Sequence, residues 1–172
     1  DSIGVLRFDG NGRAVGERRF LGLYTSGAYM RRPGEVPLVR AKVEQVLQRS
    51  GLRPHSHSGK ALKHILETLP RDELFQCTAE ELHAIAGSVL GLQERSRPRL
   101  LLRHDRFGRF FSALIYIPRD RFNTGVRERI EAMLMAALGG ESIDTQIQIG
   151  ESSLARLHAV IRPRPGASAD VD

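Results

Sequence analysis

Several residue types are scarce in this 172-residue chain, and each scarcity excludes a class of protein. Its one cysteine, Cys77, cannot form an internal disulfide, which favours a reducing compartment, the cytoplasm. No apolar run approaches the roughly 20 residues needed to cross a bilayer, so we expect no membrane partner. The start lacks the basic and apolar stretches of a signal peptide. It also lacks an initiator methionine, so we expect a piece of a longer protein whose other domains are its first partners.

Lysine is nearly absent as well, because Lys42, Lys60 and Lys63 are the three lysines among 26 basic residues. The net charge of +6 favours anionic partners such as nucleic acid. A nucleic-acid footprint would cluster the charge on one face and interleave aromatic residues for base stacking. The arginines here are spread along the chain beside acidic residues, as in Arg71-Asp72-Glu73. This pattern predicts an ion-paired, solvated surface and no nucleic-acid partner. Nucleic-acid binding is the least favoured alternative.

Apolar residues make up 41% of the chain and charged residues 27%, which is typical of a globular protein with one domain or two small ones. Residues 3–23 have the pattern of a β-hairpin, because apolar strands flank Asp9-Gly10-Asn11-Gly12, a turn sequence. Two strands alone are marginally stable. We therefore assign residues 1–30 to a hairpin that belongs to a preceding or neighbouring domain. Residues 25–35, rich in Ser, Gly and Pro, predict a loop.

A helical connecting segment is predicted for residues 31–78. Pro37 suits the first turn of one helix, which Gly51 ends. A second helix begins near Ser58 and ends at Pro70, and one further short turn follows it.

Residues 79–162 predict one α+β domain. Thr78 and Glu81 have the spacing of a capping box, which opens its first helix. The apolar periodicity then predicts strands at 98–103 and 109–117, a helix at 124–138, and strands at 143–149 and 154–162. Residues 163–172 have the composition of a linker.

The order helix, strand, strand, helix, strand, strand matches a ferredoxin-like fold whose first strand has moved to the end. We therefore predict a circularly permuted, ferredoxin-like antiparallel sandwich, αββαββ, with two helices on one face of a four-stranded sheet. The strand at 109–117 is apolar on both sides. Its second face should be covered by another domain or another copy, so Phe110, Leu114 and Tyr116 are candidate interface residues.

No motif in the sequence points to catalysis. His55 and His57 lie in a loop without further ligands nearby, so we expect no metal site. Ser58-Gly59-Lys60 lacks the earlier glycine and the following serine or threonine of a phosphate-binding loop. There is no Gly-x-Gly-x-x-Gly for a dinucleotide, no serine at a strand–turn–helix elbow, and no pair of carboxylates set among apolar residues. From the residues alone we expect a non-catalytic regulatory, docking or scaffolding segment.

Several long strings of the sequence resemble one family. They are Arg19-Phe-Leu-Gly-Leu-Tyr-Thr-Ser-Gly-Ala-Tyr29, Gly59-Lys-Ala-Leu-Lys-His-Ile-Leu-Glu-Thr-Leu-Pro-Arg-Asp-Glu-Leu-Phe75, Phe107-Gly-Arg-Phe-Phe-Ser-Ala-Leu-Ile-Tyr-Ile-Pro-Arg-Asp-Arg-Phe-Asn123, and Leu154-Ala-Arg-Leu-His-Ala-Val160. The chain resembles the N-terminal region of the large bacterial NAD-specific glutamate dehydrogenases. The resemblance implies ACT-like modules, which are ferredoxin-like and often bind amino acids between two copies. It also implies a homo-oligomeric parent enzyme that deaminates L-glutamate to 2-oxoglutarate and ammonium while reducing NAD.

The family's catalytic lysine and dinucleotide-binding motifs have no counterpart in this chain, so we assign no catalytic residue and expect no cofactor in this fragment. An ordinary ACT module holds its ligand at a glycine-bearing loop after its first strand, whereas Asn123-Thr124-Gly125 follows a second strand here. We favour a regulatory or assembly segment of such a dehydrogenase. The alternative is an amino-acid-sensing module, with Arg119, Asn123 and Thr124 as ligand contacts and an amino acid as effector.

Overall fold

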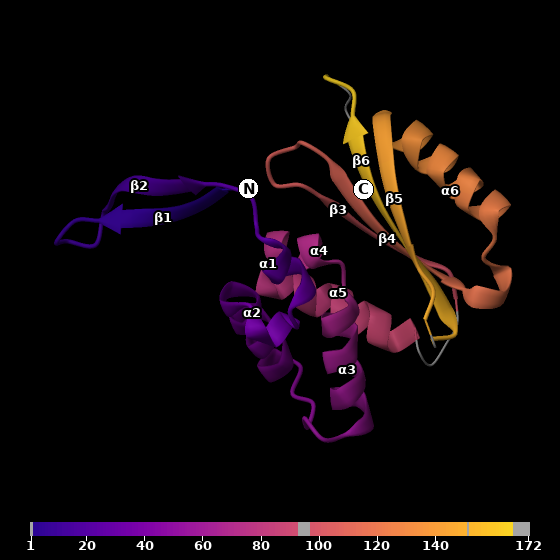
Figure 1. Ribbon diagram of the computed structural model, residues 1–172, viewed down its shortest axis with the longest axis horizontal. Helices are drawn as coiled ribbons and strands as arrows, with labels where there is room; N and C mark the ends of the chain where they lie inside the picture. Colours follow the sequence, from indigo (N-terminus) through magenta and orange to yellow (C-terminus); the bar gives the residue numbers. More distant parts are fainter. Residues whose placement is uncertain (1, 93–96, 151, 167–172) are drawn as a thin grey trace.

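A computed structural model describes residues 2–92, 97–150 and 152–166 of the chain. It contains a hairpin, a group of helices and a four-stranded sheet, which lie in this order along the chain (Figure 1). Among the described helices, none has the length and the apolar character that crossing a bilayer requires.

The predicted hairpin is present, and it is formed by β1 (Ser2–Phe8) and β2 (Ala14–Leu21), which pair antiparallel. In its turn, Asp9 Oδ1 accepts hydrogen bonds from the backbone N–H groups of Asn11 and Arg13, both at 2.9 Å. Gly12 has a φ of +78°, which a residue with a Cβ rarely adopts. The hairpin extends away from the rest of the molecule (Figure 1), and residues 3–8 and 14–21 are all exposed.

The predicted helical segment is also present. It consists of α2 (Pro37–Arg49), α3 (His57–Thr68) and α4 (Arg71–Gln76), which are followed by α5 (Ala79–Leu92). We call α2 to α5 the helical layer. Apolar residues of these helices form one continuous core, which also includes residues of the sheet: Val39, Val43, Val46, Leu62, Leu66, Leu74, Leu82, Ala86, Leu114 and Tyr116.

Local signals explain where these helices begin. Ser56, two residues before the predicted start, caps α3, because its Oγ accepts a hydrogen bond from the backbone N–H of Gly59 at 3.1 Å. The capping box before α5 is confirmed. Thr78 Oγ1 accepts a hydrogen bond from the Glu81 N–H at 3.2 Å, and Glu81 Oε2 accepts one from the Thr78 N–H at 2.7 Å.

The loop that we predicted at residues 25–35 is partly wrong. The structure has a short helix there, α1 (Ser26–Met30), and a 3₁₀ turn, η1 (Pro33–Glu35). Tyr24 and Tyr29 lie against Phe75 of α4, with ring centroids 4.3 and 5.8 Å away. These contacts order a segment whose own composition favours a loop, and no local pattern announces them.

The sheet contains β3 (Arg99–His104), β4 (Phe111–Pro118), β5 (Gly140–Gln148) and β6 (Leu154–Pro163) in the order β3-β4-β6-β5, with all neighbours antiparallel. A ferredoxin-like sheet acquires this order when its first strand is moved to the end of the chain. The predicted fold class is therefore confirmed. A 3₁₀ turn, η2 (Arg119–Arg121), and then α6 (Thr124–Ala137) connect β4 to β5.

One detail of the predicted sandwich is wrong, because its two helices lie on opposite faces of the sheet. Residues Val126, Ile130, Leu134 and Leu138, in and just after α6, pack with Phe111, Ala113, Ile115 and Ile117 of β4. The apolar stripe of α5 instead belongs to the core that contains Leu114 and Tyr116 on the other side of β4. Apolar periodicity shows that a helix buries one face, but it does not say against which partner. For α5 that partner includes α2 and α3.

Candidate functional site

The second face of β4 is covered by this chain's own helical layer. Leu114 is 2% exposed and Tyr116 is 7% exposed, and both pack with the helices. Phe110 directly precedes β4 and is half-buried, with the guanidinium of Arg109 at 5.8 Å from its ring centroid. Two of the three candidate interface residues thus lie at a contact between layers within the chain.

The candidate ligand contacts lie at one end of the sheet and have local structural partners. The backbone N–H of Arg119 donates to the Ser153 carbonyl at 2.8 Å, and its Nη1 donates to the Gly150 carbonyl at 3.0 Å. Asn123 caps α6, since its Oδ1 accepts a hydrogen bond from the Val126 N–H at 3.0 Å. Thr124 begins the helix and is exposed. Their role in holding a ligand stays a prediction.

A buried polar cluster joins the helical layer to the sheet, and the sequence analysis missed it. Glu73 of α4 is 2% exposed and accepts hydrogen bonds from Arg103 Nε of β3 at 3.0 Å, from Arg103 Nη2 at 2.8 Å, and from Ser112 Oγ of β4 at 2.7 Å. Ser112 Oγ is also 3.0 Å from His158 Nε2 of β6, and Cys77 Sγ is 3.3 Å from Glu73 Oε2. We call these five residues the polar cluster.

The position of Glu73 corrects our expectation that the run Arg71-Asp72-Glu73 forms a solvated, locally paired surface. Its partner, Arg103, is 30 residues away in the sequence and lies on a different element. A signal was present in the strands, because Ser112 and His158 lie among mostly apolar residues of β4 and β6. A buried polar residue in such a stretch requires a partner.

Charge and burial together set the ionisation of the polar cluster. Burial alone would raise the pKa of Glu73, but the hydrogen bonds and charge of Arg103, with the hydroxyl of Ser112, hold that pKa below its ordinary value. Burial lowers the pKa of His158, so the ring is neutral at pH 7 and its 3.9 Å approach to Glu73 is not an ion pair. Burial and the charge of Glu73 raise the pKa of Cys77, which stays a thiol.

The polar cluster is therefore suited to holding structure rather than to nucleophilic catalysis. A serine triad needs its carboxylate on the histidine nitrogen that is remote from the serine, but Glu73 approaches the same Nε2 as Ser112 does. Ser112 is 1% exposed, so its hydroxyl offers a substrate almost no accessible surface. A protonated, buried Cys77 is likewise a poor nucleophile.

Two more long-range contacts hold the helical layer in place. Lys42 Nζ of α2 donates to the carbonyls of Leu74, Phe75 and Cys77 at 3.1, 2.7 and 2.7 Å, which satisfies the end of α4. Arg156 Nη1 of β6 donates to the carbonyl of Thr68 at the end of α3. Together with the polar cluster, these bonds connect three helices to one another and to the sheet.

A groove of about 580 Å³ opens beside the polar cluster, and we call it the sheet groove. Asp72 and Gln76 of α4 line one side, and Asp144, Val160 and Arg162 of β5 and β6 line the other. Arg162 Nη1 and Asp144 Oδ2 form an exposed ion pair at 2.6 Å. The sheet groove thus presents carboxylates and a guanidinium to the solvent.

The described part of the chain offers no clustered set of metal ligands. Within residues 2–92, 97–150 and 152–166, no group of three or more His, Cys, Asp or Glu side chains is arranged to hold an ion. His55 and His57 are both exposed.

Two family models match the chain. The first is described as glutamate dehydrogenase, helical motif 1, and matches residues 36–95, while the second is described as glutamate dehydrogenase, ACT2 domain, and matches residues 99–172. These ranges correspond to the helical layer and to the domain that contains the sheet. No solved structure matches the chain significantly.

Curated relatives carry the same description. NAD-specific glutamate dehydrogenases from Halomonas elongata, Pseudomonas aeruginosa and Mycobacterium tuberculosis are 43%, 39% and 34% identical to this chain, over 94%, 100% and 91% of its length. The matched part is 10%, 11% and 10% of those proteins. The chain therefore spans about a tenth of the length of the relatives it matches.

Proposed function

The chain belongs to the NAD-specific glutamate dehydrogenase family, as a segment that carries its helical motif 1 and its ACT2 domain, and we propose that it acts there as a non-catalytic regulatory and assembly segment. The whole enzyme would convert L-glutamate, NAD and water into 2-oxoglutarate, ammonium and NADH. Because the chain spans a small part of such proteins, we assign the binding sites for NAD and glutamate to the other parts of the whole enzyme. The buried, reduced Cys77 suits a cytoplasmic enzyme.

The observation that carries this proposal is the buried ion pair between Glu73 and Arg103. A buried pair of this kind contributes little net stability compared with apolar residues, but breaking it is costly, so it fixes how two layers meet. The helical motif and the ACT2 sheet would then move as one body. A body of this kind can pass a displacement from one flanking part of a long chain to the other.

The hairpin supports the assembly part of the proposal. We place β1 and β2 against a neighbouring domain of the same enzyme. Their exposed side chains include the large apolar residues Ile3, Val5, Leu6, Phe8, Val15, Phe20 and Leu21. An isolated hairpin of this kind is marginally stable in water, and docking would bury its apolar surface. The same contact in each subunit would contribute to a homo-oligomer.

The test uses the full-length enzyme and the isolated chain. In the full-length enzyme, the hairpin variant Ile3→Ser/Phe20→Ser should alter the assembled mass measured by light scattering, or the response to effectors, with turnover per assembled enzyme unchanged. The control, Leu38→Ser/Met133→Ser, removes from helices apolar side chains that are at least as exposed, and it should change neither. NADH formation by the isolated chain, or a hairpin variant identical to wild type in both readouts, would overturn the proposal.

A second candidate function, amino-acid sensing, is favoured by the charges of the sheet groove. Asp72 and Asp144 could hold an ammonium group, and Arg162 a carboxylate, which are the two charges of an amino acid. Calorimetric titration with a panel of amino acids tests it. Loss of the heat in Arg162→Ala would assign binding to the sheet groove, and loss in Arg119→Ala would assign it to Arg119, Asn123 and Thr124. No heat above dilution would end this candidate.

A further inference from the structure

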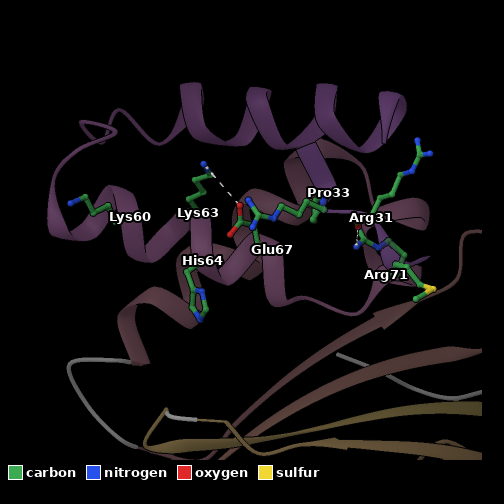
Figure 2. Close-up of a pocket in the computed structure, with 9 residues that line it drawn as sticks. Arg31, Pro33, Lys60, Lys63, His64, Glu67 and Arg71 are labelled. Carbon is green, nitrogen blue, oxygen red and sulfur yellow. Dashed lines mark hydrogen bonds and ion pairs between the residues drawn. The ribbon is translucent and has the colours of Figure 1, made fainter. Parts of the chain in front are cut away.

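A second groove, which the proposed function does not use, is lined by residues of the helical layer and of the segment that precedes it. It has a volume of about 520 Å³, and we call it the cationic groove. Lys60, Lys63 and Glu67 line it from α3, Arg31 and Arg32 line it from the turn between α1 and η1, and Arg71 of α4 lies at one end (Figure 2).

The cationic groove concentrates positive charge. Its lining holds five permanent cations and one carboxylate, a net charge of +4, whereas the whole chain has a net charge of +6. The sequence contains only three lysines, and two of them, Lys60 and Lys63, line the cationic groove. Such a concentration is costly in a folded protein unless a negative charge occupies it.

The charges of the cationic groove are poorly neutralised from within the chain. Among the described residues, the ion pair in the groove is Lys63 with Glu67, at 4.0 Å between exposed side chains (Figure 2). Arg71 is held differently, because its Nη2 donates to the carbonyls of Tyr29 at 3.3 Å and Arg31 at 2.6 Å. Its Nη1 is shielded from water and has no hydrogen-bond partner in the described part of the chain. A negative charge in the groove would offset that unbalanced guanidinium through space.

The lining also restricts the ligand. Its one aromatic ring is the imidazole of His64 (Figure 2), and its apolar contribution comes from Met30 and Pro33. Fixed guanidinium groups favour the oxygens of phosphate, and flexible lysines add point charges around it. A volume of about 520 Å³ is that of a small-molecule site rather than of an extended peptide surface.

We propose that the cationic groove binds the phosphate groups of a small molecule, with Arg71, Arg31 and Lys63 around a phosphate and Lys60 and Arg32 at its rim. Glu67 would release Lys63 to the ligand, since an exposed pair at 4.0 Å is weak. Phosphate supplies most of the recognition, because five cations line the groove and the ring of His64 is the single aromatic surface beside them.

The test is calorimetric titration of the chain with pyrophosphate at low salt, with inorganic phosphate, ADP and a glutamate-rich peptide as parallel arms. We expect saturable pyrophosphate binding that weakens as salt rises. Lys60→Gln/Lys63→Gln should weaken it at least about fivefold, because the charge-assisted contact of Lys63 and the rim charge of Lys60 are both lost. The control Arg40→Gln/Arg129→Gln makes the same change in net charge at exposed helical positions outside the groove and should alter affinity less than about twofold.

Each outcome of these titrations decides the proposal. ADP and pyrophosphate with similar affinities support recognition through phosphate, whereas much tighter binding of ADP would mean that the base is recognised as well and would overturn that part. Equal weakening by the control pair would mean nonspecific attraction and would overturn the site. No saturable binding of pyrophosphate, or a preference for the glutamate-rich peptide, would overturn it as well.

Discussion

Glu73 illustrates what residue-level reasoning can and cannot recover. The buried, inert thiol of Cys77 was predictable, because its neighbours Gln76 and Thr78 offer no cation to activate it. The burial of Glu73 was not predictable, because its acidic and basic neighbours in the sequence suggest a run of residues exposed to solvent. Its burial depends on Arg103 and Ser112, which reach it through the pairing of β3 with β4. That register is a property of the folded sheet.

Replacing Glu73 tests the buried ion pair. Glu73→Ala should lower the free energy of unfolding by about 3–5 kcal/mol, because Arg103 is left buried without a counterion. Urea unfolding measures it, and the double variant Glu73→Ala/Arg103→Ala should cost less than the sum of the two single variants. Asp144→Ala, which breaks an exposed pair, is the control and should cost at most about 1 kcal/mol. A Glu73→Ala variant that costs no more than Asp144→Ala would contradict the role of Glu73.

The polar cluster also predicts how stability depends on pH. His158 has a folded-state pKa below its ordinary value of 6.5, so the unfolded chain takes up this proton first and stability falls as pH drops through that value. Glu73 has a folded-state pKa below its ordinary value of 4.5, so its contribution is complete above 4.5 and is lost as pH falls further. Both groups thus make acid destabilising.

Urea midpoints from about pH 8 to about pH 4 check this order. His158→Gln should remove most of the decline between about pH 7 and about pH 5, and the later decline should remain. If the variant and the wild type lose stability in parallel over that upper range, another group is responsible.

At the level of elements, the sequence predicted most helices and strands because their signals are local. Caps at Thr78 and Asn123, the turn at Asp9 and alternation along β5 all lie within a few residues of what they specify. The short helix α1 and the face chosen by α5 were missed, since both depend on partners far away in the chain. For α1 this partner is the ring of Phe75, against which Tyr24 and Tyr29 pack.

The cap of α6 gives a prediction at this level. Asn123→Ala should lower the stability of the chain by about 1 kcal/mol, because the Val126 N–H loses its acceptor. Asn123→Asp should retain most of the stability, since a carboxylate accepts the same bond and favours the positive end of the helix. Thermal unfolding followed by circular dichroism measures both. An Asn123→Ala variant with an unchanged Tm would contradict the capping role and leave ligand binding as the reason for this residue.

At the scale of the whole molecule, the hairpin is energetically separate from the rest. Residues 3–8 and 14–21 are exposed, and the two cores are built from residues 36 onward. Our division into residues 1–30, 31–78, 79–162 and 163–172 stays a prediction, and the packing of α5 with α2 and α3 favours moving the boundary between residues 78 and 79 beyond α5. Residues 167–172 of the predicted linker lie outside the described residues.

Deleting residues 1–22 tests this independence. The remaining chain should unfold in one cooperative transition with a Tm within about 2 °C of the full chain, because the deletion removes no side chain of either core. Scanning calorimetry measures the transition, and deletion of β6 serves as the destabilising control. A broad transition, or a Tm lowered by several degrees, would mean that the hairpin contributes to the fold of this chain.

The placement of α5 and α6 on opposite sides of the sheet restricts how a neighbour can reach it. With helices over both broad surfaces, the direct approach for another polypeptide is along a rim, where a border strand has main-chain donors and acceptors to spare. On the β5 rim, Ile147 is 44% exposed and offers an apolar contact beside those groups. A neighbour that adds a strand at this rim would extend the sheet sideways without separating either layer of helices from it.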